Sequence, residues 1–171
     1  MRRTPWAGLL ALLALVAVPA FAGEKEAKVE VKVMKYDDLS DLIKKNKGKV
    51  IVVDFWQDFC TVCKREMPKL IDLKTKYGDD LIAITVNLDD PNDPKLRERN
   101  EKTLRAKKAA NTINVLLDEK EDVWQKKLNV TSFPTIFVFN QEGKYEKRYP
   151  EDKENFDYGD VAQVVANLLK K

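Results

Sequence analysis

Two cysteines, Cys60 and Cys63, are the only thiols in this chain of 171 residues, and two residues separate them. At the start of a helix, free backbone N–H groups and a partial positive charge favour the thiolate form of a cysteine. A cysteine three residues further on lies one turn away on the same side, where it can attack a mixed disulfide. The spacing therefore predicts Cys60 as an exposed nucleophile and Cys63 as the resolving thiol.

The segments on either side of the pair predict the elements that position it. A continuous apolar run, residues 50–53, precedes Asp54, Phe55 and Trp56, and such a run is typical of a strand buried on both faces. We expect this strand over about residues 49–55. The segment after Cys60 has a helical pattern to about residue 77, with Gly78 as a C-terminal cap and Pro68 inside the helix.

Two other uses of a cysteine pair remain as alternatives. A purely structural bridge is possible, although a loop this short constrains little of the unfolded chain. A structural zinc site needs four Cys or His ligands, and this chain has two cysteines and no histidine. Redox chemistry without a metal or an organic cofactor is the favoured interpretation.

Together with the segments on either side, the stretch around Cys60 and Cys63 resembles the thioredoxin superfamily. The resemblance rests on VVDFW at residues 52–56, on C-x-x-C-K, and on Pro68 five residues after Cys63. Ser132-Phe133-Pro134-Thr135 looks like the cis-proline loop of that superfamily. The run C-K-R-E-M-P at residues 63–68 looks like the C-(R/K)-x-E-x-P pattern of the TlpA/ResA-like branch, whose members are extracytoplasmic thiol-disulfide oxidoreductases.

The resemblance covers the chain from about residue 50 to its C-terminus, with two departures. Phe59 stands where the family usually has tryptophan, and Thr61-Val62 is an uncommon pair between the cysteines. The fold implied is α/β, a thioredoxin-like mixed central sheet with helices on both faces and a helical insertion. The resemblance also implies a reductant of client disulfides, apocytochrome c among the possible clients, that receives electrons from a membrane redox partner.

Asp54 is the third candidate catalytic residue. It ends an otherwise apolar strand, so burial should raise its pKa, and a buried carboxyl near Cys63 could take or give a proton during exchange. The resemblance supports this role, since thioredoxins carry an aspartate at the matching position. The alternative is a strand-end carboxylate that reaches water.

Four residues are candidates for binding the client. The resemblance implies that the Phe133–Pro134 peptide bond is cis and packs against the disulfide, exposing the Phe133 backbone to an extended client. An ordinary trans Pro134 is the alternative. Trp56 and Phe59 are expected to line the surface around Cys60, although core packing would explain Trp56 equally well.

The N-terminus has the pattern of a secretory signal peptide. Arg2 and Arg3 precede an apolar core at residues 8–18, and Ala20-Phe21-Ala22 resembles a cleavage site. We expect cleavage after Ala22 and a mature domain over residues 23–171, in the periplasm or secreted; a retained membrane anchor is the alternative. Loss of the two arginines lowers the net charge from +3 to +1, so the composition does not indicate a nucleic-acid binder.

The rest of the chain alternates between strand and helix patterns, which predicts a mixed sheet covered on both faces. Strands are expected near residues 29–33, 81–88, 115–117, 135–139 and 144–149, and helices near 37–43, 122–128 and 161–169. Asp93-Pro94 predicts the start of a helix whose basic segment, residues 95–108, is either a solvated face or a docking face for an acidic partner.

Three functions stay open from the sequence. The first is a thiol-disulfide oxidoreductase that reduces client proteins through Cys60 and Cys63. The second is the reverse reaction, in which the pair donates its disulfide. The third is a non-catalytic thioredoxin-like binding module with a structural disulfide. The sequence does not indicate the oligomeric state.

Overall fold

The structure is a computed structural model that describes residues 28–150 and 157–170. Its elements follow one another in the order β1 (Val31–Met34), α1 (Tyr36–Lys45), β2 (Val50–Trp56), α2 (Thr61–Tyr77), η1 (Gly78–Asp80), β3 (Leu81–Asn87), α3 (Pro94–Ala106), η2 (Ala109–Asn111), β4 (Ile113–Leu117), α4 (Glu121–Leu128), β5 (Thr135–Phe139), β6 (Tyr145–Tyr149) and α5 (Tyr158–Leu169).

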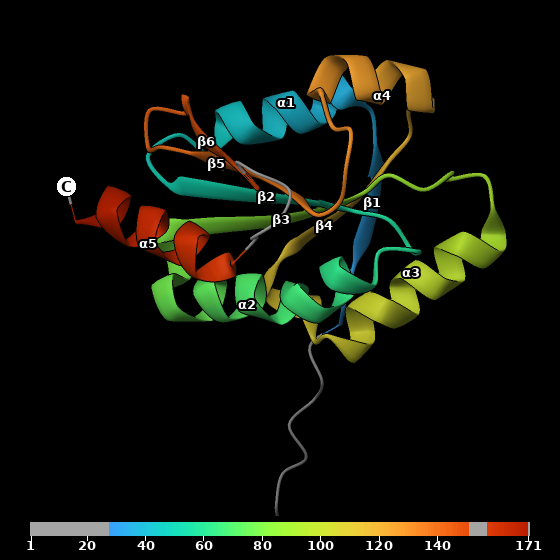
Figure 1. Ribbon diagram of the computed structural model, residues 1–171, viewed down its shortest axis with the longest axis horizontal. Coiled ribbons are helices and arrows are strands. Elements are labelled where there is room, and N and C mark those ends of the chain that lie inside the picture. The colour runs from blue at the N-terminus through green and yellow to red at the C-terminus, as the bar shows by residue number, and fades with distance from the viewer. Residues whose placement is uncertain (1–27, 151–156, 171) are drawn as a thin grey trace, which may run out of the picture.

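Six strands form one mixed sheet in the order β1-β4-β3-β2-β5-β6. The pairs β1·β4, β4·β3 and β3·β2 are parallel, and β5 and β6 return antiparallel. Helices α1 and α4 cover one face of the sheet, and α2 and α5 cover the other, with α3 beside α2 (Figure 1). The predicted α/β fold class, with helices on both faces, is confirmed.

Strand β2 is the central element on which the candidate site is built. All seven of its residues are buried, as expected for a strand that pairs on both sides and is covered on both faces. Asp54 lies opposite Thr85 of β3 and Ile136 of β5, so its carboxyl group belongs to the middle of the sheet.

Side chains alternate along β2 between two apolar cores. Val50 and Val52 pack with α2 and α5, whereas Ile51 and Val53 pack in the cluster that includes Trp124 of α4. By this alternation, Asp54 and Trp56 belong to the face that α2 covers. A third cluster joins Trp56 to both cysteines and to Leu104 of α3.

The predicted helical insertion is present as α3. Asp93 caps it by accepting bonds from the main-chain N–H groups of Lys95 and Leu96, with Pro94 in the first turn. Asn100 and Leu104 are buried, so α3 packs on the domain and keeps its basic residues on the outer side.

Residues 1–22 lie outside the described residues, so the signal peptide stays a prediction. In residues 28–150 and 157–170, no helix combines the length and the apolar character needed to cross a bilayer.

Candidate active site

Cys60 is the N-cap residue of α2, and it forms a disulfide with Cys63. The Cys60 Sγ accepts a hydrogen bond of 3.1 Å from the Cys63 main-chain N–H. The sulfur therefore occupies the place that a capping side-chain oxygen normally takes at the positive end of a helix dipole. An anionic sulfur at this atom would be stabilised by both effects.

The side chains of two candidate residues, Cys60 and Trp56, are less exposed than expected. Cys60 exposes only 6% of its surface in the disulfide form, because Trp56, Met67 and Ile71 pack around the pair. The expectation that Trp56 lines the client-facing surface is wrong: the indole is fully buried, as its position on the inward face of β2 requires. Core packing, the alternative for Trp56, is what the structure shows.

Asp54 is buried, with 1% of its surface exposed, and its Oδ1 has no hydrogen-bond partner in the described part of the chain. Burial raises the pKa of its carboxyl to about 8. The alternative of a carboxylate that reaches water is therefore excluded. Asp54 shares the face of β2 with Trp56, which packs in the cluster that contains Cys63, and a carboxyl with this pKa can exchange a proton near neutral pH.

A cavity of about 530 Å³ opens beside the disulfide and includes Cys60 but not Cys63 in its lining. Phe59, whose side chain is 71% exposed, meets Phe133 edge to face with ring centroids 5.9 Å apart. Phe133 also contacts Trp124 of α4, at 6.3 Å between centroids. The cavity thus joins the first cysteine to an aromatic wall contributed by three separate segments.

The loop before β5 supplies one side of this cavity. Phe133 is half-buried and Pro134 is buried, and the peptide bond between them is cis, the isomer that the resemblance implies. Phe133 also packs against the cluster that contains both cysteines. Phe133 is therefore brought next to the consecutive residues Phe59 and Cys60 from a distant position in the sequence.

Comparison with known proteins agrees with this geometry. A family model described as thioredoxin-like matches residues 48–145, more than half of the chain. This chain belongs to the thioredoxin-like family. Sporulation thiol-disulfide oxidoreductase A of Bacillus subtilis is 31% identical over 141 residues, which cover 81% of this chain and 82% of that protein.

Two further members of the thioredoxin-like family extend the comparison. The thiol-disulfide oxidoreductase ResA of Geobacillus thermodenitrificans is 29% identical over 104 residues, 59% of this chain and 54% of that protein. The crystal structure of the thioredoxin domain of a thiol-disulfide oxidoreductase from Bacteroides vulgatus matches with a TM-score of 0.54 and 27% identity, over 71% of this chain and 82% of that one. With the Cys60–Cys63 pair, these relatives support the expected enzyme class.

Sequence reasoning missed several residues at this thioredoxin-like site. Glu121, Trp124 and Gln125 of α4 line the cavity beside the disulfide, but nothing in the local pattern around α4 pointed to Cys60. Glu66 of α2 is also buried, and it is ion-paired with Lys69 at 2.7 Å. Hydrogen bonds from Lys69 and Arg65 keep the pKa of Glu66 below its usual value.

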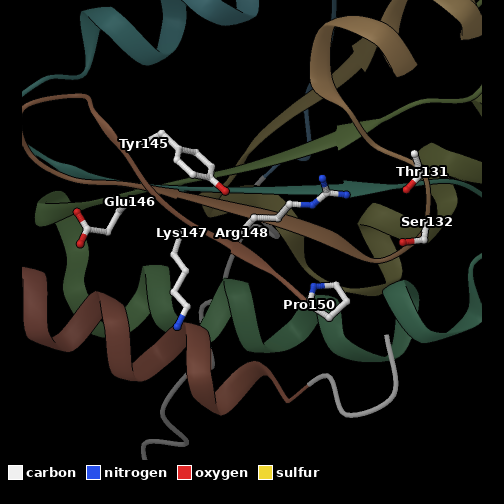
Figure 2. A pocket seen from close by; sticks show the side chains of 7 residues that line it. All are labelled: Thr131, Ser132, Tyr145, Glu146, Lys147, Arg148 and Pro150. Atoms are coloured by element: carbon white, nitrogen blue, oxygen red, sulfur yellow. The ribbon is translucent and has the colours of Figure 1, made fainter. Parts of the chain in front are cut away.

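A separate hollow of about 460 Å³ lies along the edge strand β6, where the Arg148 side chain extends toward Thr131 and Ser132 (Figure 2). Arg148 donates a hydrogen bond to the Asn129 carbonyl oxygen at 2.8 Å. Thr131 and Ser132 border this hollow as well as the cavity at the disulfide. The loop before β5 therefore separates the hollow along β6 from the cavity at the disulfide. Cys60 lines only the cavity at the disulfide.

Within the described residues, no group of three or more His, Cys, Asp or Glu side chains is arranged to hold a metal ion. The candidate reactive groups of the site are the cysteine pair and the buried Asp54 carboxyl.

Proposed function

We propose that this protein reduces disulfides of client proteins outside the cytoplasm by exchange with the Cys60–Cys63 pair. The observation that carries the proposal is the Cys60 sulfur, which caps α2 and borders the cavity, while Cys63 stays buried behind it. One thiol can thus meet a client and the other can act only on the first.

In the proposed reaction, the Cys60 thiolate attacks one sulfur of a client disulfide. A bond forms between Cys60 and that sulfur, the client disulfide breaks, and the second client sulfur leaves as a thiolate. Cys63 then gives its proton to the ionised form of Asp54, which is the minor form below its pKa of about 8, and attacks the Cys60 Sγ. The Cys60–Cys63 disulfide forms, the remaining client sulfur leaves, and the client has gained two electrons.

The aromatic wall gives the client a binding surface. Phe59 and Phe133 present apolar ring surface next to Cys60, which suits an unfolded or extended polypeptide that exposes its own apolar side chains. We propose client proteins with cysteine pairs, apocytochrome c among them, and a membrane redox partner that returns the pair to the dithiol.

The extracytoplasmic location rests on the signal-peptide pattern of residues 1–22 and on the preference of stable disulfides for oxidising compartments. Expression of the full chain in a bacterial host with an N-terminal readout by mass spectrometry tests it. A mature N-terminus at Gly23 in the periplasmic fraction supports the location, and an uncut chain in the cytosol contradicts it.

Insulin reduction tests the activity, with dithiothreitol as electron donor and precipitation of the insulin B chain as readout. The wild-type protein should accelerate precipitation, and Cys60→Ser should reduce the rate to that of dithiothreitol alone with the fold intact by circular dichroism. A folded wild-type protein without activity would leave the binding module with a structural disulfide. An opposite preference, for oxidising reduced clients, would support the disulfide-donating alternative.

A further inference from the structure

The segment between β2 and α2, residues 57–60, is held by the end of β3 and the connection that follows it; we call this segment the redox loop. The Leu88 N–H donates to the Trp56 carbonyl at 3.0 Å, and the Gln57 side chain donates to the Leu88 carbonyl at 2.8 Å. The Asp58 N–H donates to the Asp89 Oδ2 at 2.9 Å. The backbone leading to Cys60 is therefore fixed from outside its own strand and helix.

Helix α3 completes this attachment through a buried side chain. Asn100 is 4% exposed, and its amide donates to the Asn87 Oδ1 and to the Asp89 Oδ2, both at 3.0 Å. The same Asp89 oxygen accepts the bond from the redox loop. The insertion helix and the redox loop therefore share one buried acceptor.

The Asp58 side chain forms a second connection, and this one carries charge. Its Oδ1 accepts from the Lys64 ammonium at 2.6 Å, and its Oδ2 accepts from the Arg99 Nε at 2.7 Å. Burial alone would raise the pKa of Asp58, but the hydrogen bonds from Lys64 and Arg99 outweigh burial and keep that pKa below its usual value. Asp58 is thus an anion paired with one cation from α2 and one from α3.

This charge lies close to the attacking sulfur. Asp58 is two residues before Cys60, and two residues of extended chain span at most about 7 Å. This span joins the Cα atoms of the two residues and is comparable to the Debye length of about 8 Å at physiological ionic strength, so salt only partly screens the interaction between their side chains. An unpaired Asp58 carboxylate would oppose a thiolate at Cys60, and its two cations offset that effect.

Apart from Lys64 and Arg99, the charged side chains among the described residues that line the Cys60 cavity or bond to the backbone of the redox loop are acidic. Asp89 accepts the loop's N–H, and Glu121 of α4 lines the same cavity as Cys60. Asp54 is largely neutral below its pKa of about 8. The two cations that pair with Asp58, together with the N-terminus of α2, counter these acidic groups.

We propose that Arg99 is a positioning and charge-balancing residue for the redox reaction: by pairing with Asp58, it lets the insertion helix favour the thiolate of Cys60. This proposal rests on the proposed function, because it takes Cys60 as the attacking thiol. It gives α3 a role at the active site. The two interpretations of its basic residues from the sequence, a solvated face or a docking face for an acidic partner, did not include this role.

Substitution of arginines on α3 tests the proposal. Cys60 is made the only thiol by Cys63→Ser, and its pKa is read from the pH dependence of alkylation by iodoacetamide. Arg99→Gln should raise the Cys60 pKa by about half a unit, which slows alkylation about 3-fold at a pH below both values. The matched control is Arg97→Gln, the same change two residues away. Arg97 is exposed and forms no ion pair with a described residue. Arg97→Gln should shift the pKa by less than about 0.2 unit.

A second variant separates charge from structure. Asp58→Asn removes the anion and leaves both cations, so it should lower the Cys60 pKa by about half a unit, opposite to Arg99→Gln. The double variant should return to within about 0.2 unit of the parent. Shifts of the two single variants in the same direction would overturn the proposal and indicate a merely structural contact. Equal shifts for Arg97→Gln and Arg99→Gln would also overturn it.

These outcomes are independent of whether the protein acts as a reductant. The direction of exchange depends on the reduction potential of the parent protein, whereas the proposal depends only on differences between variants with a single thiol. A protein that fails to reduce insulin could still show the opposite shifts, and an active reductant could lack them.

Discussion

The Sγ of Cys60 accepts the main-chain N–H of Cys63 at 3.1 Å, so the sulfur of the first cysteine caps the helix that carries the second. A hydrogen bond to an ionised acceptor is about twice as strong as one to a neutral acceptor. When the reduced Cys60 ionises, this bond becomes a charge-assisted one. The geometry therefore predicts different roles for the two thiols, with Cys60 favoured as the thiolate and Cys63 as the thiol.

The first prediction follows from this separation. Cys63→Ser should retain the attack by Cys60 but lose resolution, so covalent protein–client complexes should accumulate. Cys60→Ser should give no such complexes, because the remaining thiol is buried. Non-reducing gel electrophoresis with a disulfide-containing client measures the complexes, and dithiothreitol should release them. Equal trapping by both variants would contradict the assignment of roles.

The second prediction concerns Asp54. Its pKa is about 8 in the folded protein, above the usual value of 3.8 that applies to the unfolded chain. The folded state therefore binds more protons between about pH 4 and pH 8, and the contribution of Asp54 to stability is lost as the pH rises through this window. Asp54→Asn should flatten the pH dependence and should be more stable than the parent at pH 8 by more than about 1 kcal/mol.

Urea unfolding of the oxidised protein at pH 5 and pH 8 measures this difference. In the reduced protein, Asp54→Asn should also slow the resolving step, seen as slower release of client from the mixed disulfide at neutral pH. A parent protein whose stability does not fall between pH 5 and pH 8 would argue against a buried, protonated Asp54.

The third prediction concerns the aromatic wall of the cavity. Phe59 is 71% exposed, so Phe59→Ala should change the free energy of unfolding by no more than about 0.5 kcal/mol. Loss of the Phe59 ring should nevertheless raise the KM for insulin, roughly 3-fold to 10-fold, because an exposed ring next to Cys60 would contact a polypeptide client. The rate with glutathione disulfide, which is too small to span the wall, should stay the same.

Tyr145→Ala is the matched control for Phe59→Ala. Tyr145 is another exposed aromatic residue, at 56%, but it belongs to β6 and packs on Phe137 and Phe139 away from the disulfide. Its removal should leave the KM for insulin unchanged. An equal effect of the two variants would mean that the wall does not bind the client.

The fourth prediction concerns a buried polar residue that joins β3, η2 and β4. The Oδ1 of Asn114 accepts from the hydroxyls of Thr85 and Thr112, both at 2.9 Å, and its amide donates to the Ala109 carbonyl at 2.8 Å. Asn114→Leu leaves these groups unsatisfied and should lower the free energy of unfolding by about 2–4 kcal/mol. Asn92→Leu, an exposed control, should change it by less than about 0.5 kcal/mol. Comparable losses for the two variants would contradict the account.

Much of the fold could be predicted from the sequence, because its signals are local. The apolar run at residues 50–53 predicted the central strand, observed as Val50–Trp56, and Gly78 ends α2 with a positive φ of 52° as a cap requires. Asp93-Pro94 predicted the start of α3, and the expected strand at residues 135–139 is observed as β5. The order of the strands in the sheet was not predicted, because it depends on pairing between segments far apart in the chain.

The parts of the site that could not be predicted depend on contacts between distant segments. Nothing around Arg99 indicates that it meets Asp58, 41 residues earlier in the chain. Trp124 lines the cavity only because α4 packs beside the loop that carries Phe133. From the sequence, Trp56 could line the surface around Cys60 or pack in the core, and the alternation of β2 turns its side chain inward.

The reduction potential of the Cys60–Cys63 pair tests the central claim most directly. The protein is equilibrated with glutathione buffers of defined ratio, and the dithiol fraction is read after acid quenching and thiol labelling. A reductant should give a potential near or below that of thioredoxin, about −270 mV. A value near about −120 mV would contradict the claim and identify an oxidant that hands on its disulfide. A folded protein whose pair never equilibrates would contradict both enzyme functions.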